Sequence, residues 1–229
     1  MRRLTLEEAT RALKAGEPVI MPTDTVCGLG LSVLAAESPA ELFRLKGRPS
    51  GKPVAWLVGG VRALDEYGKD VPPYARALAE RFWPGGLTLV VSASEAVPPL
   101  FQSEAGTIGL RMPASPDVLA LIEASGGPLA VTSANRSGAP APGRIEAVDP
   151  ALAEAAAGVF SLGPASASSA LDAPTAPLPA AAAPVSAASA TPAPAAAAVA
   201  STVLDCTADA PRLLREGALS LEELKGALS

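Results

Sequence analysis

Short apolar runs and longer stretches with helix signals follow one another along the whole chain. Thr5 and Glu8 have the spacing of a capping box, so a helix is predicted from there to a terminator at Gly16. Buried strands are predicted where the apolar runs are short and continuous, at 17–21, 26–33, 54–58, 87–91, 107–111, 128–131, 159–162 and 202–204. Further helices are predicted at 38–46, 61–67, 72–82, 116–126, 144–156 and 220–228. Because strands and helices are intermixed throughout, the pattern predicts an α/β fold.

The stretch at 164–200 breaks this pattern. It consists mainly of alanine and proline, and Asp172 is its only charged residue. Proline recurs too often for a helix, and the side chains are too small to form a core. We expect one domain over 1–229, with a disordered or polyproline-like surface insertion at about 164–200 rather than a partner-binding motif.

The composition excludes several kinds of chemistry. The chain has 229 residues, a net charge of −5 and no histidine. Without histidine there is no Ser-His or Cys-His catalysis and no His-ligated metal site. The acidic balance also argues against a protein dedicated to duplex nucleic acid, which would carry a basic surface.

The cysteines and the N-terminus indicate the compartment. Cys27 and Cys206 have the character of small buried residues in a reducing compartment, although a disulfide between them remains possible. Arg2 and Arg3 are not followed by an apolar run of signal-peptide length. Outside the alanine- and proline-rich stretch, no segment has the length and apolar character of a membrane span. We expect a soluble cytoplasmic protein without membrane contact.

A cationic loop at 46–53 is the first candidate for a functional site. Lys46, Arg48 and Lys52 are interleaved there with glycine and proline, which end a helix and let a phosphate approach the backbone. On an acidic protein such a loop favours a local anion site. An exposed basic turn is the alternative.

Other polar turns lie close to predicted strands, at 22–25, 107–111, 132–138 and 201–202, with Arg215 near the end of the chain. Open α/β sheets bind ligands where such loops converge. The turns contain hydroxyls and cations rather than paired carboxylates, which favours binding of a polyanion over glycoside hydrolysis. There is no phosphate-loop motif of the ordinary ATPases.

Six short motifs resemble, in order, those of the YrdC-like proteins, the threonylcarbamoyl-AMP synthases. They are residues 22–30 (PTDTVCGLG), 46–49 (KGRP), 109–113 (GLRMP), 133–138 (SANRSG), 201–205 (STVLD) and 214–217 (LREG). One motif alone would be weak evidence, but the shared order makes coincidence a poor explanation.

The resemblance implies a single domain in which a twisted mixed sheet with flanking helices surrounds a large, positively lined cavity. It implies a nucleotidyltransferase that converts L-threonine, bicarbonate and ATP into threonylcarbamoyl-AMP and pyrophosphate, with Mg²⁺ accompanying the triphosphate. A downstream complex would then transfer the threonylcarbamoyl group to tRNA. Such chemistry relies on positioning and charge stabilisation, so a protein without histidine can perform it.

The resemblance also implies roles for individual residues. Lys46 and Arg48 would be the catalytic cations that hold the triphosphate. The expected ATP-binding residues are Arg48, Lys52, Thr107, Ser133, Asn135 and Arg215. The expected threonine-binding residues are Thr25, Arg111, Val131 through its backbone, and Ser201. No metal ligands are expected from the protein.

The chain departs from the family pattern at a few positions. Asp24 and Cys27 stand where the family more often has Glu and Tyr, and both changes are compatible with the site. Leu57 stands where some members place a threonine-contacting His, so that contact is missing or made otherwise. Two other functions remain as alternatives: a module that binds tRNA or double-stranded RNA weakly, and a carbamoyl-transfer domain.

Overall fold

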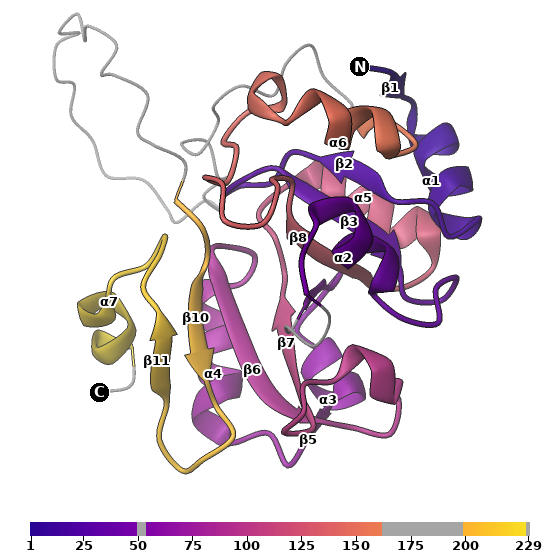
Figure 1. Ribbon diagram of the computed structural model, residues 1–229. Helices are drawn as coiled ribbons and strands as arrows, with labels where there is room; N and C mark the ends of the chain where they lie inside the picture. Colours follow the sequence, from indigo (N-terminus) through magenta and orange to yellow (C-terminus); the bar gives the residue numbers. More distant parts are fainter. Residues whose placement is uncertain (50–53, 162–198, 228–229) are drawn as a thin grey trace, which may run out of the picture.

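The computed structural model describes residues 1–49, 54–161 and 199–227 and confirms the α/β class (Figure 1). The strands are β1 (Arg3–Leu4), β2 (Val19–Met21), β3 (Gly28–Ser32), β4 (Ala55–Leu57), β5 (Gly68–Lys69), β6 (Leu87–Ala93), β7 (Thr107–Arg111), β8 (Leu129–Ser133), β9 (Val159–Phe160), β10 (Thr202–Asp205) and β11 (Arg212–Arg215). The helices are α1 (Leu6–Lys14), α2 (Ala40–Lys46), α3 (Ala63–Tyr67), α4 (Pro73–Phe82), α5 (Pro116–Ser125), α6 (Pro150–Ala155) and α7 (Leu221–Gly226).

The described strands form one mixed sheet in the order β1-β9-β2-β3-β8-β4-β7-β6-β10-β11, with β5 paired to β6. The pairs β4–β7 and β6–β10 are parallel, whereas β3–β8, β4–β8 and β6–β7 are antiparallel. Because β10 pairs with β6, the segment that begins at 199 belongs to the same sheet as the rest of the chain. This continuity supports a single domain.

Local signals in the sequence set the ends of the helices. Thr5 and Glu8 form the expected capping box at the start of α1, and α7 begins with a second one. The helix α2 ends at Lys46, where Gly47 has a φ of 58° that favours glycine. The chain therefore leaves α2 abruptly, and Arg48 already lies in the loop.

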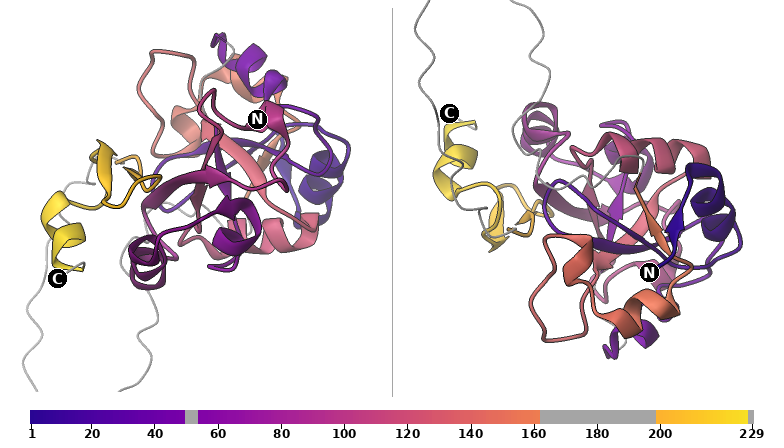
Figure 2. Two further views of the ribbon diagram at one scale, coloured as in Figure 1. Left: turned by 90° about the horizontal axis from the view of Figure 1, so that it is seen from below. Right: turned by 90° about the horizontal axis from the view of Figure 1, so that it is seen from above.

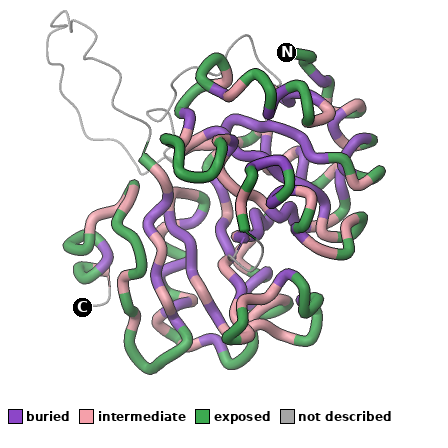
Figure 3. Tube along the Cα trace, in the orientation of Figure 1, coloured by how far each residue is buried: buried purple, intermediate pink, exposed green. Residues whose placement is uncertain are grey.

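Most large apolar side chains lie in one core between the sheet and the helices α2, α3, α4 and α6 (Figure 3). Leu29, Trp56, Leu89 and Leu110 point into this core from four strands, and each is at most 1% exposed. Burying a side chain of this size contributes about 1.5–3 kcal/mol. This face of the sheet is therefore the main source of stability.

The helices α1 and α5 lie together against the opposite face (Figure 2). They form a second core with Met21, Leu57 and Leu129 of the sheet. Leu57 and Leu129 pair with each other, whereas Met21 lies in the row of Gly28 and Ser133, and the half-buried Val131 also packs against this core. Ala55 and Gly109, on the same face, are half-buried and belong to neither core.

The end of β8 was predicted two residues too early, at residue 131. Residues 132–138 were expected to be a turn, but Thr132 and Ser133 belong to the strand. They pair with Leu29 and Gly28 of β3, and this ladder keeps the backbone extended despite the polar side chains.

The helix expected at 144–156 is shorter than predicted. A single 3-10 turn, Ile145–Ala147, precedes α6. Asp149 caps α6 by accepting from the backbone N–H groups of Ala151 and Leu152, and Pro150 starts it. The cap fixes the start of α6 several residues later than the apolar pattern suggested.

Some other expectations changed or stay untested. The two-residue strands β1 and β5 were not predicted, because such short strands carry no periodic signal. Cys27 and Cys206 are buried free cysteines, as their interpretation as small core residues required. Lys52 and most of the insertion expected at 164–200 lie outside the described residues.

Candidate functional site: an uncovered sheet face between two polar groups

The centre of the site is a half-buried part of the sheet that borders the second core. Ala55 of β4 pairs with Gly109 of β7 on one side and with Val131 of β8 on the other. Paired residues face the same side of a sheet. All three are half-buried, although β4 and β7 are central strands. We call the row Ala55, Gly109 and Val131 the floor of the site.

Glycines on and next to the floor leave this part of the sheet without large side chains. A Cβ at Gly28 or Gly30 would lie 2.7 and 2.8 Å from the methyl groups of Val131, which leaves no room for a side chain. A Cβ at Gly109 would lie 3.4 Å from Cγ2 of Thr88, an ordinary contact. Gly109 is therefore not required by packing, and its missing side chain leaves the floor flat.

The first polar group lies at the edge where β8 ends. Lys46 is buried, and its Nζ donates to the carbonyl oxygens of Ser133 and Asn135, the latter at 2.6 Å. It also donates to Oδ1 of Asn135 at 3.1 Å. Arg48 reaches Oγ1 of Thr132 at 3.4 Å and lies 5.8 Å from the centre of the Phe43 ring. The predicted residues Lys46, Arg48, Ser133 and Asn135 are thus brought together.

The electrostatics of this group favour an anion. Burial, and then the nearby charge of Arg48, lower the pKa of Lys46 from 10.5 to about 8. Burial likewise lowers the pKa of Arg48. Among the described residues, no carboxylate forms an ion pair with Lys46. A negative ligand would relieve this excess of positive charge.

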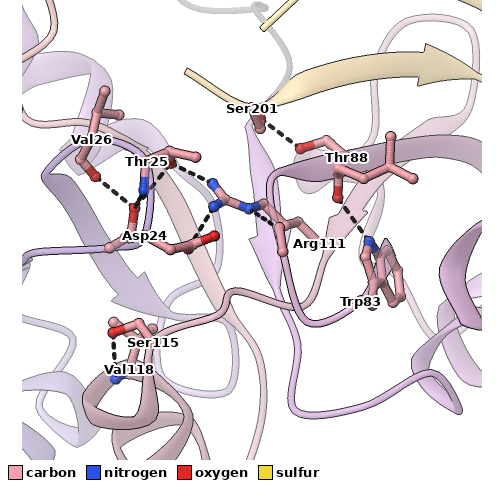
Figure 4. A network of polar contacts seen from close by, with 12 residues as sticks. Asp24, Thr25, Val26, Trp83, Thr88, Arg111, Ser115, Val118 and Ser201 are labelled. Atoms are coloured by element: carbon pink, nitrogen blue, oxygen red, sulfur yellow. Dashed lines mark hydrogen bonds and ion pairs between the residues drawn. The ribbon is translucent and has the colours of Figure 1, made fainter. Parts of the chain in front are cut away.

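The second polar group surrounds Arg111 at the end of β7 (Figure 4). The Arg111 side chain donates from Nε to the carbonyl oxygen of Gly85 at 2.9 Å and from NH1 to Oγ1 of Thr25 at 2.8 Å. Its NH2 forms a buried ion pair with Oδ1 of Asp24 at 2.6 Å. Contacts in three directions fix the guanidinium, so its orientation is set before any ligand binds.

Ser201 and Arg215 complete the second group from the C-terminal part of the chain. The hydroxyl of Ser201 bonds that of Thr88 at 2.9 Å (Figure 4). Arg215 donates from NH2 to the carbonyl oxygen and the hydroxyl of Ser201 at 2.9 and 3.1 Å. Burial, and then the charge of Arg111, lower the pKa of Arg215. The two arginines are therefore close enough to repel each other, which again favours a bound anion.

The floor connects the two polar groups. Thr107 begins β7 and Arg111 ends it, so their Cα atoms are about 13 Å apart along the strand. Gly109 lies midway between them. The hydroxyl of Thr107 bonds that of Ser103 at 2.7 Å, and no described contact joins it to the first polar group. Two cationic ends on one flat strip could hold an elongated anionic ligand.

The site includes residues that the sequence did not single out for it. Thr88 is 4% exposed and bonds Ser201, and Asp24 pairs with Arg111. The sequence signal that could have identified Thr88 was its polar side chain within the apolar run 87–91. Leu57 lies in the core with α1 and α5, so it does not replace the contact that some family members make through His.

A separate hollow of about 590 Å³ lies over α1 and α5 and shares no residue with either polar group. Its polar rim includes Arg11, which is already paired with Glu7. The polar groups, rather than this hollow, define the candidate site. The large, positively lined cavity expected from the resemblance stays a prediction.

Together, these features define the chain as an α/β protein with a candidate site for an anionic ligand on one sheet face. The chain belongs to the Sua5/YciO/YrdC family, whose model, described as "Telomere recombination", matches residues 11–172.

Its relatives are named for one activity. A protein of Bacillus subtilis named threonylcarbamoyl-AMP synthase is 32% identical over 224 residues, which cover 97% of this chain and 56% of that protein. A putative threonylcarbamoyl-AMP synthase of Mycobacterium tuberculosis is 33% identical over 220 residues, covering 96% of this chain and 87% of the relative. The structure of Pyrococcus abyssi Sua5 complexed with L-threonine matches with a TM-score of 0.78 and 30% identity, over 100% of this chain and 61% of that chain.

The chain thus spans little more than half the length of the Bacillus relative. No helix in the described ranges is long and apolar enough to span a membrane.

Proposed function

We propose that the chain makes threonylcarbamoyl-AMP and pyrophosphate from L-threonine, bicarbonate and ATP. The observation that carries this proposal is the pair of cationic groups at the two ends of one half-buried sheet face. The names of the relatives, and the L-threonine bound to Pyrococcus abyssi Sua5, favour this reaction over an RNA-binding module or a carbamoyl-transfer domain.

Threonine is assigned to the second polar group. The carboxylate of the amino acid would bind the fixed guanidinium of Arg111, beside the hydroxyls of Thr25 and Ser201. The backbone of Val131, on the floor, would contact the rest of the molecule. Arg111 suits this task because Asp24 and Gly85 already hold its orientation.

ATP is assigned to the floor and the first polar group. Arg48 would bind the triphosphate, with Lys52, which lies outside the described residues, as a further cation. Ser133, Asn135 and Thr107 would contact the same nucleotide. Arg215 would meet the α-phosphate, because the reaction requires that phosphate to lie next to the threonine end.

The proposed reaction needs little covalent chemistry from the protein. Threonine and bicarbonate first combine into a carbamate, with release of water and a proton. A carbamate oxygen then attacks the α-phosphorus, and the bond to the leaving pyrophosphate breaks. Negative charge on the phosphoryl oxygens would be stabilised by cations whose positions are already fixed.

Mg²⁺ would enter with the triphosphate. The described residues contain no cluster of acidic or cysteine side chains that could hold a metal, so phosphate oxygens and water would supply most of its ligands. Transfer of the product to tRNA by a downstream complex, weak tRNA or double-stranded RNA binding, and a cytoplasmic location belong to the same proposal.

Product formation with single omissions tests the proposal. The purified chain is incubated with ATP, Mg²⁺, bicarbonate and L-threonine, and threonylcarbamoyl-AMP and pyrophosphate are measured. We expect both products in equal amounts and neither when threonine is omitted. Pyrophosphate release that ignores threonine, or salt-sensitive tRNA binding by a folded chain that forms no product, contradicts the proposal.

A further inference from the structure

The protein itself occupies the ammonium group of Lys46. The ammonium donates to both carbonyl oxygens of the turn, those of Ser133 and Asn135, and to the Asn135 side chain. An ammonium has three N–H donors. The acceptors found among the described residues therefore use all of them, and the residue is only 4% exposed.

The same turn is fastened to Lys46 a second time, through the backbone. The N–H of Ser137 donates to the carbonyl oxygen of Lys46 at 2.9 Å. Within the turn, Nδ2 of Asn135 donates to the carbonyl oxygens of Arg136 and Ala139 at 3.0 and 2.5 Å. Residues 133–139 are thus tied to the last residue of α2.

Arg48 is held quite differently. It is half-buried, its bond to Thr132 is long at 3.4 Å, and its guanidinium lies near the Phe43 ring. A guanidinium also has five donors. The Arg48 side chain therefore has more donors than the three of the Lys46 ammonium.

We infer that Lys46 is a positioning residue, which holds the turn 133–139 so that Ser133 and Asn135 meet the nucleotide, rather than a direct ligand of the phosphates. The inference rests on the proposed function for the identity of the nucleotide. The contacts that carry it belong to the chain alone.

The inference makes hydrogen bonding, rather than charge, the important property of the side chain. Lys46→Met removes the donors to the carbonyl oxygens of Ser133 and Asn135 and leaves the Ser133 oxygen with only the N–H of Asn135, which weakens the hold on the turn. Lys46→Gln has the same length as Met but keeps two amide donors and no charge. Comparing these two variants therefore separates the two properties.

Hydrogen exchange on the ligand-free chain is the first test. We expect Lys46→Met to raise the exchange rate of the Ala134, Ser137 and Ala139 amides at least tenfold. Arg48→Met, the matched control, should leave these exchange rates unchanged. In Lys46→Gln the rates should be close to those of wild type. If Lys46→Met leaves these amides as protected as in wild type, Lys46 does not hold the turn and the inference is overturned.

The second test compares rates per folded molecule, with folding verified by urea denaturation. We expect kcat/KM for ATP to be at least tenfold higher in Lys46→Gln than in Lys46→Met. Asn135→Ala should also lower kcat/KM for ATP much less in the Lys46→Met background than in wild type, because both residues act through one turn. The inference is overturned if Lys46→Gln and Lys46→Met lower kcat/KM equally and the effect of Asn135→Ala adds fully to that of Lys46→Met. Lys46 would then be assigned to the phosphates.

The exchange test can fail independently of the proposed function. A wild-type chain without synthase activity would contradict the proposed function, yet the exchange experiment, which needs no substrate, would still decide whether Lys46 holds the turn.

Discussion

Arg111 and Ser201 illustrate how single residues of the site depend on neighbouring residues for their orientation. Arg111 owes its orientation to Asp24 and Gly85, and Ser201 owes its orientation to Thr88 and Arg215. The sequence motifs indicated Arg111, Ser201 and Arg215, but they gave no role to Asp24 or Thr88. Such supporting residues become visible only when the fold brings distant strands together.

Thr88 offers a test of this support. Its hydroxyl bonds Ser201 and its methyl group lies against the position of Gly109. Thr88→Val removes only the hydroxyl and retains the shape of the side chain. We expect KM for threonine to rise about fivefold, the effect of a hydrogen bond worth about 1 kcal/mol. Thr88→Ser, which keeps the hydroxyl, should stay close to wild type; an equal rise in both variants would argue against the role.

Among the described cations, Arg48 is the one to which we assign phosphate binding. We expect Arg48→Ala to lower kcat/KM for ATP by about 100-fold, the size of effect seen when one stabilising group is removed from a transition state. The free energy of unfolding should change little, because the side chain is only half-buried. Near-normal threonine-dependent pyrophosphate release by a folded Arg48→Ala chain would contradict the assignment.

The lowered pKa of Lys46 predicts a dependence of activity on pH. The ammonium form makes the contacts with the turn, and its pKa is about 8 in the folded chain. We expect kcat/KM for ATP to fall as the pH rises through about 8, because the turn loses a donor. In Lys46→Gln this decline should be absent. A decline that persists unchanged in Lys46→Gln belongs to another group.

The lowered pKa of Lys46 has the opposite effect on the free energy of unfolding, to which the contribution of Lys46 increases with pH. The folded chain holds this proton less tightly than the unfolded chain, whose lysine keeps a pKa near 10.5. Between these two values the unfolded state binds more protons, so the contribution of Lys46 to the free energy of unfolding rises with pH. Urea denaturation across this range should therefore show that the difference in the free energy of unfolding, wild type minus Lys46→Met, rises with pH.

Among the elements, β4, β7 and β8 decide whether the site is open. Their side chains alternate between large residues in the core with α2, α3, α4 and α6 and small residues on the floor. Ranges of most strands were predictable because apolar runs carry this signal. The extension of β8 through Ser133 was not, because polar residues in a strand are stabilised here by pairing with β3 rather than by burial.

Gly109 tests the role of the floor. A Cβ there meets Thr88 and Ala55 only at 3.4 and 3.7 Å, so packing tolerates a side chain. We expect Gly109→Val to lower kcat/KM at least about tenfold, because the side chain occupies the space between the polar groups. The free energy of unfolding should change by less than about 1 kcal/mol. Gly109→Ala should have a smaller effect, and a fully active Gly109→Val chain would show that substrates do not lie on the floor.

At the scale of the whole molecule, loops far apart in the sequence meet across one sheet. The order of six motifs predicted that they share a site, and the pairings of β3–β8, β4–β7 and β6–β10 explain how. What the sequence could not supply is their division into two groups at the ends of a floor. That division follows from strand register, which depends on pairing between distant segments.

A crystal structure of the chain with L-threonine and a non-hydrolysable ATP analogue tests the central claim most directly. We expect both ligands on the floor, with the threonine carboxylate at Arg111 and the triphosphate at Arg48, and with the α-phosphate facing the amine of threonine. Ligands bound on separate surfaces, or a nucleotide seated away from Ala55, Gly109 and Val131, would contradict the account.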